Sequence, residues 1–180
     1  NYIIGNAGKR LRPIMVLMAC DLFNGNTEKA IKPALAIEYF HNFTLIHDDI
    51  MDEAPLRRNN PTIHTLHGIN VGILSGDALL IKAYQFFEDL EPELFKKCIQ
   101  IFSETGAVLC EGQQMDVNFE TMEDVTYDNY IEMITNKTGV LSAASFKIGA
   151  LIADAKEEEA EHLITSGNIL VSLSKLWMIT

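Results

Sequence analysis

The chain has 180 residues, of which 48% are hydrophobic, so it can bury the core of one large domain or of a piece of one. Its 14 Lys and Arg against 25 Asp and Glu give a formal net charge of −11. A nucleic-acid backbone would be repelled by such a surface, which argues against a nucleic-acid-binding protein. The few basic clusters are therefore informative.

The cysteines Cys20, Cys98 and Cys110 are odd in number and widely spaced. This pattern argues against a disulfide scaffold or a structural zinc site, and it favours a reducing, cytoplasmic compartment. No stretch approaches the roughly 20 apolar residues that cross a bilayer, so no membrane span is expected.

Apolar residues recur at helical spacing almost throughout the chain. A first helix is expected to carry Ile14, Leu17, Met18 and Leu22 on one face, between Pro13 at its first turn and Gly25 at its exit. The next helices are expected around Ala34–Ile46 with an end at Pro55, over Gly72–Leu90, from Glu93 to about Phe119, from Tyr127 to about Ala153 with Thr126 as its cap, and from Lys156 onward. Strand alternation is hard to find, which predicts an all-α bundle of long antiparallel helices.

Residues 48–53 read Asp-Asp-Ile-Met-Asp-Glu at the end of an apolar helix. Asp48 and Asp52 share one helical face, where like charges destabilise a helix by about 0.2–0.5 kcal/mol per pair. A bound cation would offset this cost, and Mg²⁺ takes one or two protein carboxylates and fills its shell with water and phosphate oxygens. If the motif stood alone, an exposed acidic helix end would be its more common explanation.

Two basic groups accompany this motif. Arg57 and Arg58 follow the helix-ending Pro55, and a Gly-Lys-Arg-Leu-Arg-Pro segment occupies residues 8–13 at a helix entry. Arg matches phosphate oxygens bidentately, and helix N-termini favour anions. Each group by itself would also fit a solvated basic turn or a salt-bridge cluster.

Taken together, these motifs resemble the trans-isoprenyl diphosphate synthases of the polyprenyl synthetase family. The matching segments, in order, are Gly8–Pro13, His41 with Leu45–Asp52, Leu56–Arg58, Pro61–His64, Ser75–Leu80, Gly112-Gln113 with Asp116, and Lys137–Gly139. Their order and spacing agree from about residue 5 to residue 168. The resemblance implies one partial isoprenoid synthase domain over 1–180, an all-α barrel around a central cavity that is incomplete at both ends, and a homodimer.

The same resemblance implies a prenyltransferase that condenses an allylic diphosphate with isopentenyl diphosphate, with Mg²⁺ as cofactor. Asp48 and Asp52 are expected to bind the metal that bridges the allylic diphosphate, with Asp49 in support. Arg57 and Lys137 are expected to contact that diphosphate.

Further residues are assigned by the same resemblance. Lys9, Arg12, His41 and Arg58 are expected to hold isopentenyl diphosphate. Thr138 and Gln113 are expected to line the reacting centre and steady the allylic cation.

Product length is expected to depend on the helix face upstream of Asp48. An aromatic residue at Phe43 followed by the small Thr44 resembles enzymes that make C15 to C20 products. The hypothesis is that Phe43 forms the floor of the cavity.

The end of the sequence departs from the family. A second aspartate-rich motif, Phe-Gln-x-x-Asp-Asp-x-x-Asp, is expected after Asn168, but the chain continues with an unrelated apolar segment. Read from the third base of each codon, Trp177-Met178-Ile179 spells Asp-Asp, and permitted codons from Asn168 spell the missing motif. We therefore expect residues 169–180 to be an out-of-frame tail, and we expect loss of this motif to impair turnover.

Other functions fit parts of this pattern. A catalytically inactive binding or regulatory subunit of a prenyl diphosphate synthase fits the missing second motif. A class I terpene cyclase also uses an aspartate-rich helix, but it needs no site for isopentenyl diphosphate, so Lys9, Arg12 and His41 argue against it. A purely structural bundle leaves the spacing of these charges to coincidence.

Overall fold

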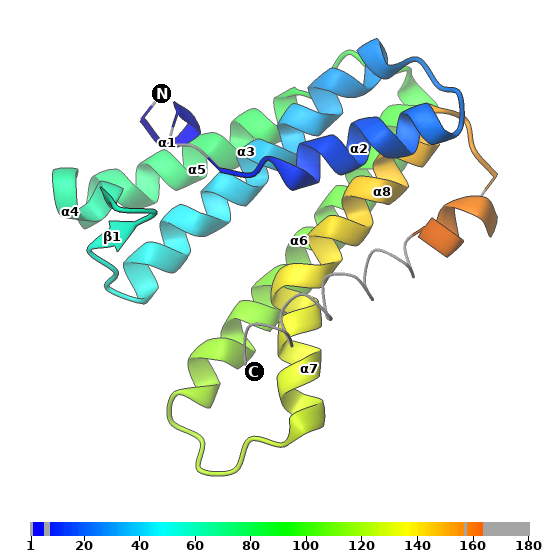
Figure 1. Ribbon diagram of the computed structural model, residues 1–180. Helices are drawn as coiled ribbons and strands as arrows, with labels where there is room; N and C mark the ends of the chain where they lie inside the picture. Colours follow the sequence, from blue (N-terminus) through cyan, green and yellow to red (C-terminus); the bar gives the residue numbers. More distant parts are fainter. Residues whose placement is uncertain (1, 6–7, 157, 164–180) are drawn as a thin grey trace.

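The computed structural model describes residues 2–5, 8–156 and 158–163, and it confirms the predicted all-α class (Figure 1). The helices are α1 (Tyr2–Gly5), α2 (Leu11–Leu22), α3 (Thr27–Met51), α4 (Ile63–His67), α5 (Ile69–Gln85), α6 (Pro92–Phe119), α7 (Tyr127–Ile134) and α8 (Val140–Ile152). A π-helix, η1 (Thr135–Gly139), joins α7 to α8, and residues 158–163 are helical. The predicted tail 169–180 lies outside the described residues.

The long helices form two arms that meet near α2 and α8 (Figure 1). The first arm is made by α3 and α5, and the second by α6, α7 and α8, with α2 packed against both α3 and α8. The pairing of α2 with α8 needs Gly149, because a Cβ there would meet the carbonyl oxygen of Val16. This arrangement places the end of α3 and the η1 turn at the same site.

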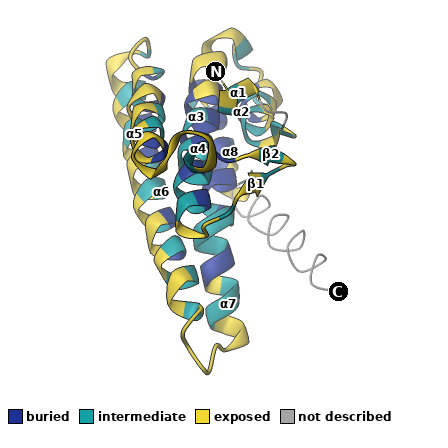
Figure 2. Ribbon diagram, turned by 90° about the vertical axis from the view of Figure 1, so that its left-hand side faces the viewer, coloured by how far each residue is buried: buried dark blue, intermediate teal, exposed yellow. Residues whose placement is uncertain are grey.

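An aromatic cluster joins the two arms. The ring of Phe102 on α6 packs edge to face on Phe40 of α3, Tyr84 of α5 and Phe87, with ring centroids 4.9, 5.1 and 5.2 Å apart. Phe87 and Phe102 are almost fully buried. Buried residues line α3 and α8, as Figure 2 shows. This packing fixes α3, and with it the aspartate motif at its end.

Of the apolar face expected for the first helix, Leu17 packs against the core and the other three residues lie at the surface. Ile14, Met18 and Leu22 are 43%, 61% and 62% exposed, whereas Val16 and Cys20 are fully buried on the opposite side of α2. The helix itself was predicted correctly. The side that it buries depends on where α3 and α8 lie, which its own periodicity does not encode.

A short hairpin that was not predicted follows the aspartate helix. Strands β1 (Leu56–Arg57) and β2 (Asn60–Pro61) pair antiparallel around Arg58 and Asn59. Both turn residues have positive φ, 52° and 64°, as a two-residue type I′ turn requires. Strands of two residues are too short to show an alternating pattern, which is why they were missed.

The single helix expected from Tyr127 to Ala153 is divided by η1. Thr126 caps its start as predicted, because its hydroxyl accepts a hydrogen bond from Asn129 N at 3.2 Å. The π-helical turn is rare and local, and turns of this kind often occur at functional sites. Here it carries Lys137 and Thr138.

Candidate functional site

The aspartate motif forms the last turn of α3. Asp48 and Asp49 both meet Arg57 of β1, whose Nη2 donates to Asp48 Oδ2 at 2.9 Å and whose Nε donates to Asp49 Oδ1 at 2.6 Å. The hairpin therefore holds both carboxylates with one guanidinium. Burial raises the pKa of Asp49, and the bond from Arg57 only partly opposes this.

Asp52 stands at the C-cap of α3, and its side chain is exposed. Partial burial and the nearby charge of Asp48 raise the pKa of its carboxyl group. A bound cation would favour the ionised form of Asp52, because its positive charge would oppose the effects of burial and of Asp48.

Lys137 of η1 faces this motif from the other arm. Its Nζ lies 3.1 Å from Asp48 Oδ1 and forms an ion pair with Asp116 of α6. Burial alone would lower the pKa of Lys137, but the hydrogen bond that it donates to Asp116 and the charge of Asp48 raise it overall. The sequence indicated Asp116 only as part of a motif. It lies three residues after Gln113 on α6, so the two side chains share one face of the helix, and this spacing could have identified Asp116 as a site residue.

The close approach of η1 to α6 depends on Gly112. A Cβ at this position would meet the backbone nitrogen of Lys137 and, at 2.7 and 2.8 Å, the backbone carbon and Cβ of Asn136. Backbone atoms cannot move aside as a flexible side chain can. Gly112 therefore sets the distance at which Lys137 reaches Asp48.

The residues present fit a magnesium ion. Asp48 Oδ1 is buried and lies 3.1 Å from Lys137 Nζ without the geometry of a hydrogen bond, so it keeps an acceptor position that a metal could use. Within the described part of the chain, no group of three or more His, Cys, Asp or Glu side chains converges as a complete metal site. Mg²⁺ needs only one or two carboxylates when phosphate oxygens and water supply the rest. Asp48 and Asp52 would be those ligands.

A central cavity of about 420 Å³ opens beside Asp48. It is lined by Arg12, His41, Thr44, Leu45, Asp48, Arg57, Arg58, Leu109, Gln113, Lys137, Thr138 and Leu141. Gln113 Nε2 is buried there without a hydrogen-bond partner. This wall combines cations, the carboxylate of Asp48 and apolar side chains from both arms.

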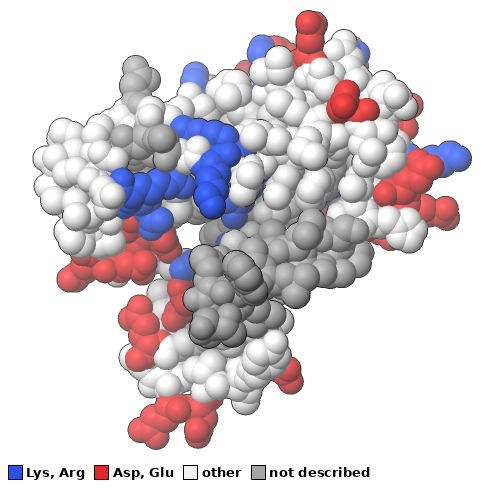
Figure 3. Space-filling model, in the orientation of Figure 1, with Lys and Arg blue, Asp and Glu red and all other residues white. Residues whose placement is uncertain are grey.

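A basic cavity of about 590 Å³ adjoins it. Its lining is Gly8, Lys9, Arg10, Leu11, Arg12, Glu38, His41 and Arg58, so it shares Arg12, His41 and Arg58 with the central cavity. Arg12 Nη1 lies 3.3 Å from His41 Nε2. Figure 3 shows Lys and Arg side chains gathered on this face, beside a patch of Asp and Glu.

The electrostatics of this cavity suit an anion. Burial, followed by the charges of Arg12 and three other arginines, lowers the pKa of His41 to about 3, so His41 is neutral near pH 7. Burial also lowers the pKa of Arg12, which Glu38 partly opposes. The cavity thus holds a surplus of positive charge that a diphosphate would balance.

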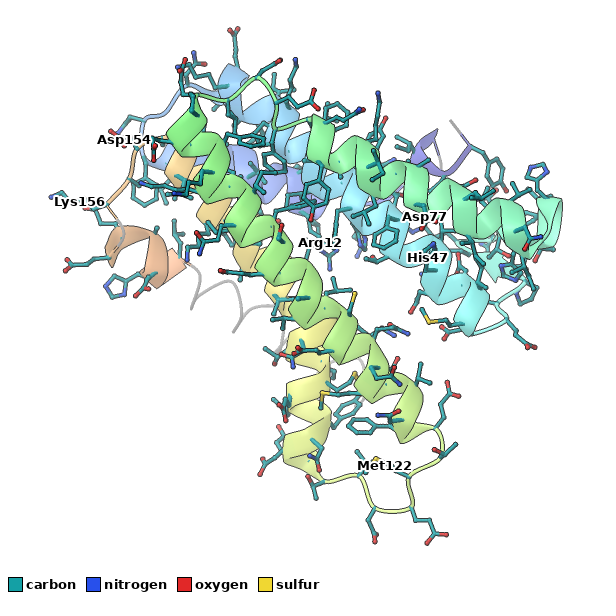
Figure 4. The ribbon with its side chains drawn as sticks, turned by 180° about the vertical axis from the view of Figure 1, so that it is seen from behind. Arg12, His47, Asp77, Met122, Asp154 and Lys156 are labelled. Carbon is teal, nitrogen blue, oxygen red and sulfur yellow. The ribbon has the colours of Figure 1, made fainter. Side chains whose placement is uncertain are left out.

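An apolar cavity of about 460 Å³ adjoins the central one on its other side. It shares Thr44, Leu109 and Gln113 with the central cavity and is also lined by Phe43, His47, Met51, Cys110, Gln114, Val117 and Glu120. The Phe43 ring packs on His47, with centroids 4.8 Å apart. His47 Nε2 lies 3.7 Å from Asp77 of α5, and Figure 4 shows the two facing each other.

The predicted site residues therefore converge on three adjoining cavities. Two of them line none of these cavities: Asp49 is buried against Arg57, and Asp52 is exposed at the helix end. The sequence placed Asp116 in a motif but assigned it no role, and it did not indicate the Arg10–Glu38 ion pair in the basic wall.

Two further predictions bear on the environment of the protein. Cys20, Cys98 and Cys110 are all free thiols. Across the described residues, no helix combines the length and apolarity that crossing a membrane requires.

Comparison with known proteins gives a consistent result. The family model described as "Polyprenyl synthetase" matches residues 1–171. A geranylgeranyl diphosphate synthase of Methanosarcina mazei is 42% identical over 171 residues, which are 94% of this chain and 53% of that protein. A (2E,6E)-farnesyl diphosphate synthase of Mycobacterium bovis is 36% identical over 90% of this chain and 45% of its own length.

Solved structures agree with this match. A crystal structure of a geranylgeranyl pyrophosphate synthase superposes with a TM-score of 0.93 at 46% identity, over 95% of this chain and 52% of that one. A polyprenyl synthase from Caulobacter crescentus, complexed with calcium and isoprenyl diphosphate, gives 0.85 at 29% identity, over 93% and 50%. The chain spans about half the length of the curated relatives that it matches. On its sequence and its fold, the chain belongs to the polyprenyl synthetase family.

Proposed function

We propose that this chain carries the first-aspartate half of a Mg²⁺-dependent prenyltransferase that joins an allylic diphosphate to isopentenyl diphosphate, giving a C15–C20 product. The observation that carries the proposal is that three cavities with different linings adjoin one another. A basic cavity for one diphosphate adjoins a central cavity with Asp48, Arg57 and Lys137, which adjoins an apolar cavity for a hydrocarbon chain.

The proposed chemistry follows from these charges. Mg²⁺ held by Asp48 and Asp52 would neutralise charge on the leaving diphosphate. Arg57 and Lys137 would donate to the same diphosphate and stabilise it as the C–O bond breaks. The apolar side chains of Leu109 and Leu141 would exclude water from the allylic cation. The C3–C4 double bond of isopentenyl diphosphate then attacks C1 of the cation, and a proton leaves to the released diphosphate.

The basic cavity distinguishes this function from that of a terpene cyclase. A cyclase acts on one diphosphate and has no use for a second anion site beside the first. Arg12, His41 and Arg58 line both the basic and the central cavity, which supports two diphosphates held side by side. Homodimer formation and a cytoplasmic location are further parts of the proposal, taken from the family and from the cysteine pattern.

A second candidate function is a binding or regulatory subunit. The expected second aspartate motif is missing from the sequence after Asn168, which favours diphosphate binding with little turnover. Co-purification with a full-length synthase, and a change in the product length of that synthase, would support this alternative.

The test is incubation of the chain with Mg²⁺, isopentenyl diphosphate and each allylic diphosphate from C5 to C15, with product-length analysis and parallel binding titrations. We expect Mg²⁺-dependent binding of the allylic diphosphates with weak or no turnover. Absence of any diphosphate binding would refute both candidate functions. Robust prenyl transfer would contradict the expected impairment, and DNA in which no single-base change restores the second motif would refute the frameshift.

A further inference from the structure

Arg10 has an unusual backbone at the entrance of the basic cavity. It is the N-cap of α2 and has φ 50° and ψ 31°, in the left-handed region that costs a residue with a Cβ energy. Such a conformation persists only where surrounding contacts hold it, and such residues cluster at functional sites. The turn at Arg10 lies between Lys9 and Arg12, the two cations that line the cavity from this segment.

The side chain of Arg10 has a specific partner. Its Nη1 forms an ion pair with Glu38 Oε1 of α3, and its Nη2 donates to the carbonyl oxygen of Ile4. The guanidinium thus connects three segments of the chain: α1, the basic turn and α3. The guanidinium of Arg10 therefore binds other groups of the protein. Arg12, in contrast, has a buried Nε with no hydrogen-bond partner and lines both the central and the basic cavity.

Glu38 is an unexpected residue in this wall. It is 7% exposed and lines a cavity whose other charged residues are Lys9, Arg10, Arg12 and Arg58. An unpaired carboxylate here would repel a diphosphate. Glu38 is fixed by Asn42 one helical turn later, because Asn42 Nδ2 donates to Glu38 Oε1 at 2.9 Å and to its carbonyl oxygen at 2.7 Å.

We propose that the Arg10–Glu38 pair is a positioning device of the basic cavity. Glu38, fixed by Asn42, holds Arg10 and so sets the left-handed turn that presents Lys9 and Arg12 to an anion. Arg10 in return neutralises Glu38, so that the cavity repels no incoming diphosphate. The inference rests on the proposed function for the identity of the anion, isopentenyl diphosphate, but not for the presence of an anion site.

The test uses Arg10→Gly, because glycine adopts a positive φ at no steric cost and the turn is therefore kept. This variant removes the guanidinium and leaves Glu38 charged in the cavity wall. Calorimetric titration with isopentenyl diphosphate, and separately with inorganic diphosphate, should show binding at least about tenfold weaker than in the original chain. The melting temperature should fall, because Glu38 is left buried and unpaired, and the double variant described next should restore part of that loss. The Mg²⁺-dependent binding of an allylic diphosphate, measured well below the melting temperature, should change little.

Two companion variants separate charge from structure. Arg10→Lys keeps the pair and should bind within about threefold of the original chain, since a cation remains beside Glu38. Arg10→Gly with Glu38→Gln removes the unpaired carboxylate and should bind both diphosphates more tightly than Arg10→Gly alone. The matched control is Lys32→Met with Asp89→Asn, an exposed ion pair between α3 and the α5–α6 connection, which should leave binding unchanged.

Each outcome decides the matter. If Arg10→Gly binds inorganic diphosphate within twofold of the original chain, or if the double variant binds no more tightly than Arg10→Gly, the inference is wrong. If inorganic diphosphate follows the expected order but isopentenyl diphosphate binds no better than inorganic diphosphate, the pair acts as proposed and the assigned substrate fails. If the original chain binds neither anion, both proposals fail.

Discussion

Lys137 Nζ lies 3.1 Å from Asp48 Oδ1, joining the π-helical turn of one arm to the aspartate helix of the other. The same ammonium pairs with Asp116, so this one cation contacts two carboxylates. A metal ion arriving at Asp48 must compete with this cation. A diphosphate arriving with the metal would instead recruit it, because its oxygens take over the role of the carboxylates.

Replacing Lys137 should therefore have opposite effects on two ligands. In Lys137→Gln, Mg²⁺ alone should bind several-fold more tightly, because Asp48 and Asp116 have lost their competing cation. Allylic diphosphate with Mg²⁺ should bind about tenfold more weakly, a loss of about 1.4 kcal/mol. Calorimetric titration measures both affinities. Lys82→Gln, an exposed change on α5, is the control. Equal shifts in the same direction would show that Lys137 does not compete with the metal.

Phe43 should limit the length of the bound hydrocarbon. It lines the apolar cavity of about 460 Å³, and its ring is supported by His47 and by Phe40, 5.6 Å away between centroids. Phe43→Ala should raise affinity for prenyl diphosphates at least one C5 unit longer than the original chain prefers, and should lengthen any product by the same amount. Titration with a C10 to C20 series is the measurement.

The matched control for this prediction is Phe87→Leu. Phe87 is fully buried in the aromatic cluster and lines none of the three cavities. Its replacement should lower stability by about 1 kcal/mol without changing the preferred chain length. If Phe43→Ala bound the same chain lengths as the original chain, the hypothesis that Phe43 forms the floor of the cavity would be wrong.

His41 should make the fold sensitive to acid. Burial and the nearby arginines lower its pKa from 6.5 to about 3 in the folded chain. Between these two pH values the unfolded chain binds a proton that the folded chain does not. The contribution of His41 to stability is thus complete above pH 6.5 and is lost progressively as pH falls towards 3, by at most about 1.4 kcal/mol per pH unit.

The measurement is the free energy of unfolding in urea from pH 7.5 to 4. His41→Gln cannot take up the proton, so its stability should fall less steeply below pH 6.5. His67→Gln, an exposed change on α4, should follow the original chain. Parallel curves for His41→Gln and the original chain would show that His41 is not held neutral.

Gly112→Ala should separate α6 from the π-helical turn. The added Cβ would meet the backbone nitrogen of Lys137, and a backbone atom cannot move aside as a flexible side chain can. We expect a loss of roughly 1–3 kcal/mol in stability, the usual cost of overpacking, together with weaker binding of allylic diphosphate. Thermal unfolding and titration give the two values.

Gly106→Ala is the control on the same helix. Its Cβ would meet only the Phe40 ring, at 3.4 and 3.5 Å, which is ordinary contact. Alanine is favoured over glycine inside a helix by about 1 kcal/mol, so this variant should match or exceed the original stability. If both substitutions stabilised the chain, Gly112 would not set the position of Lys137.

The sequence by itself determined the helices and the order of the motifs. Apolar spacing along α3, α5 and α6 is a local property, and so is the four-residue interval that puts Asp48 and Asp52 on one face. The match of several motifs in order also led to the family, which the comparisons then established. Local pattern sufficed for these conclusions because each depends only on neighbours in the chain.

The tertiary structure alone decided which charges meet. Lys137 faces Asp48, and Arg10 pairs with Glu38, because packing of α2, α3 and α8 brings together segments that are distant in sequence. The exposed face of α2, the hairpin at Arg57 and the π-helical turn were likewise beyond local pattern. Side-chain periodicity specifies that a face is apolar or charged, but the partner of that face is chosen by the packing of the whole chain.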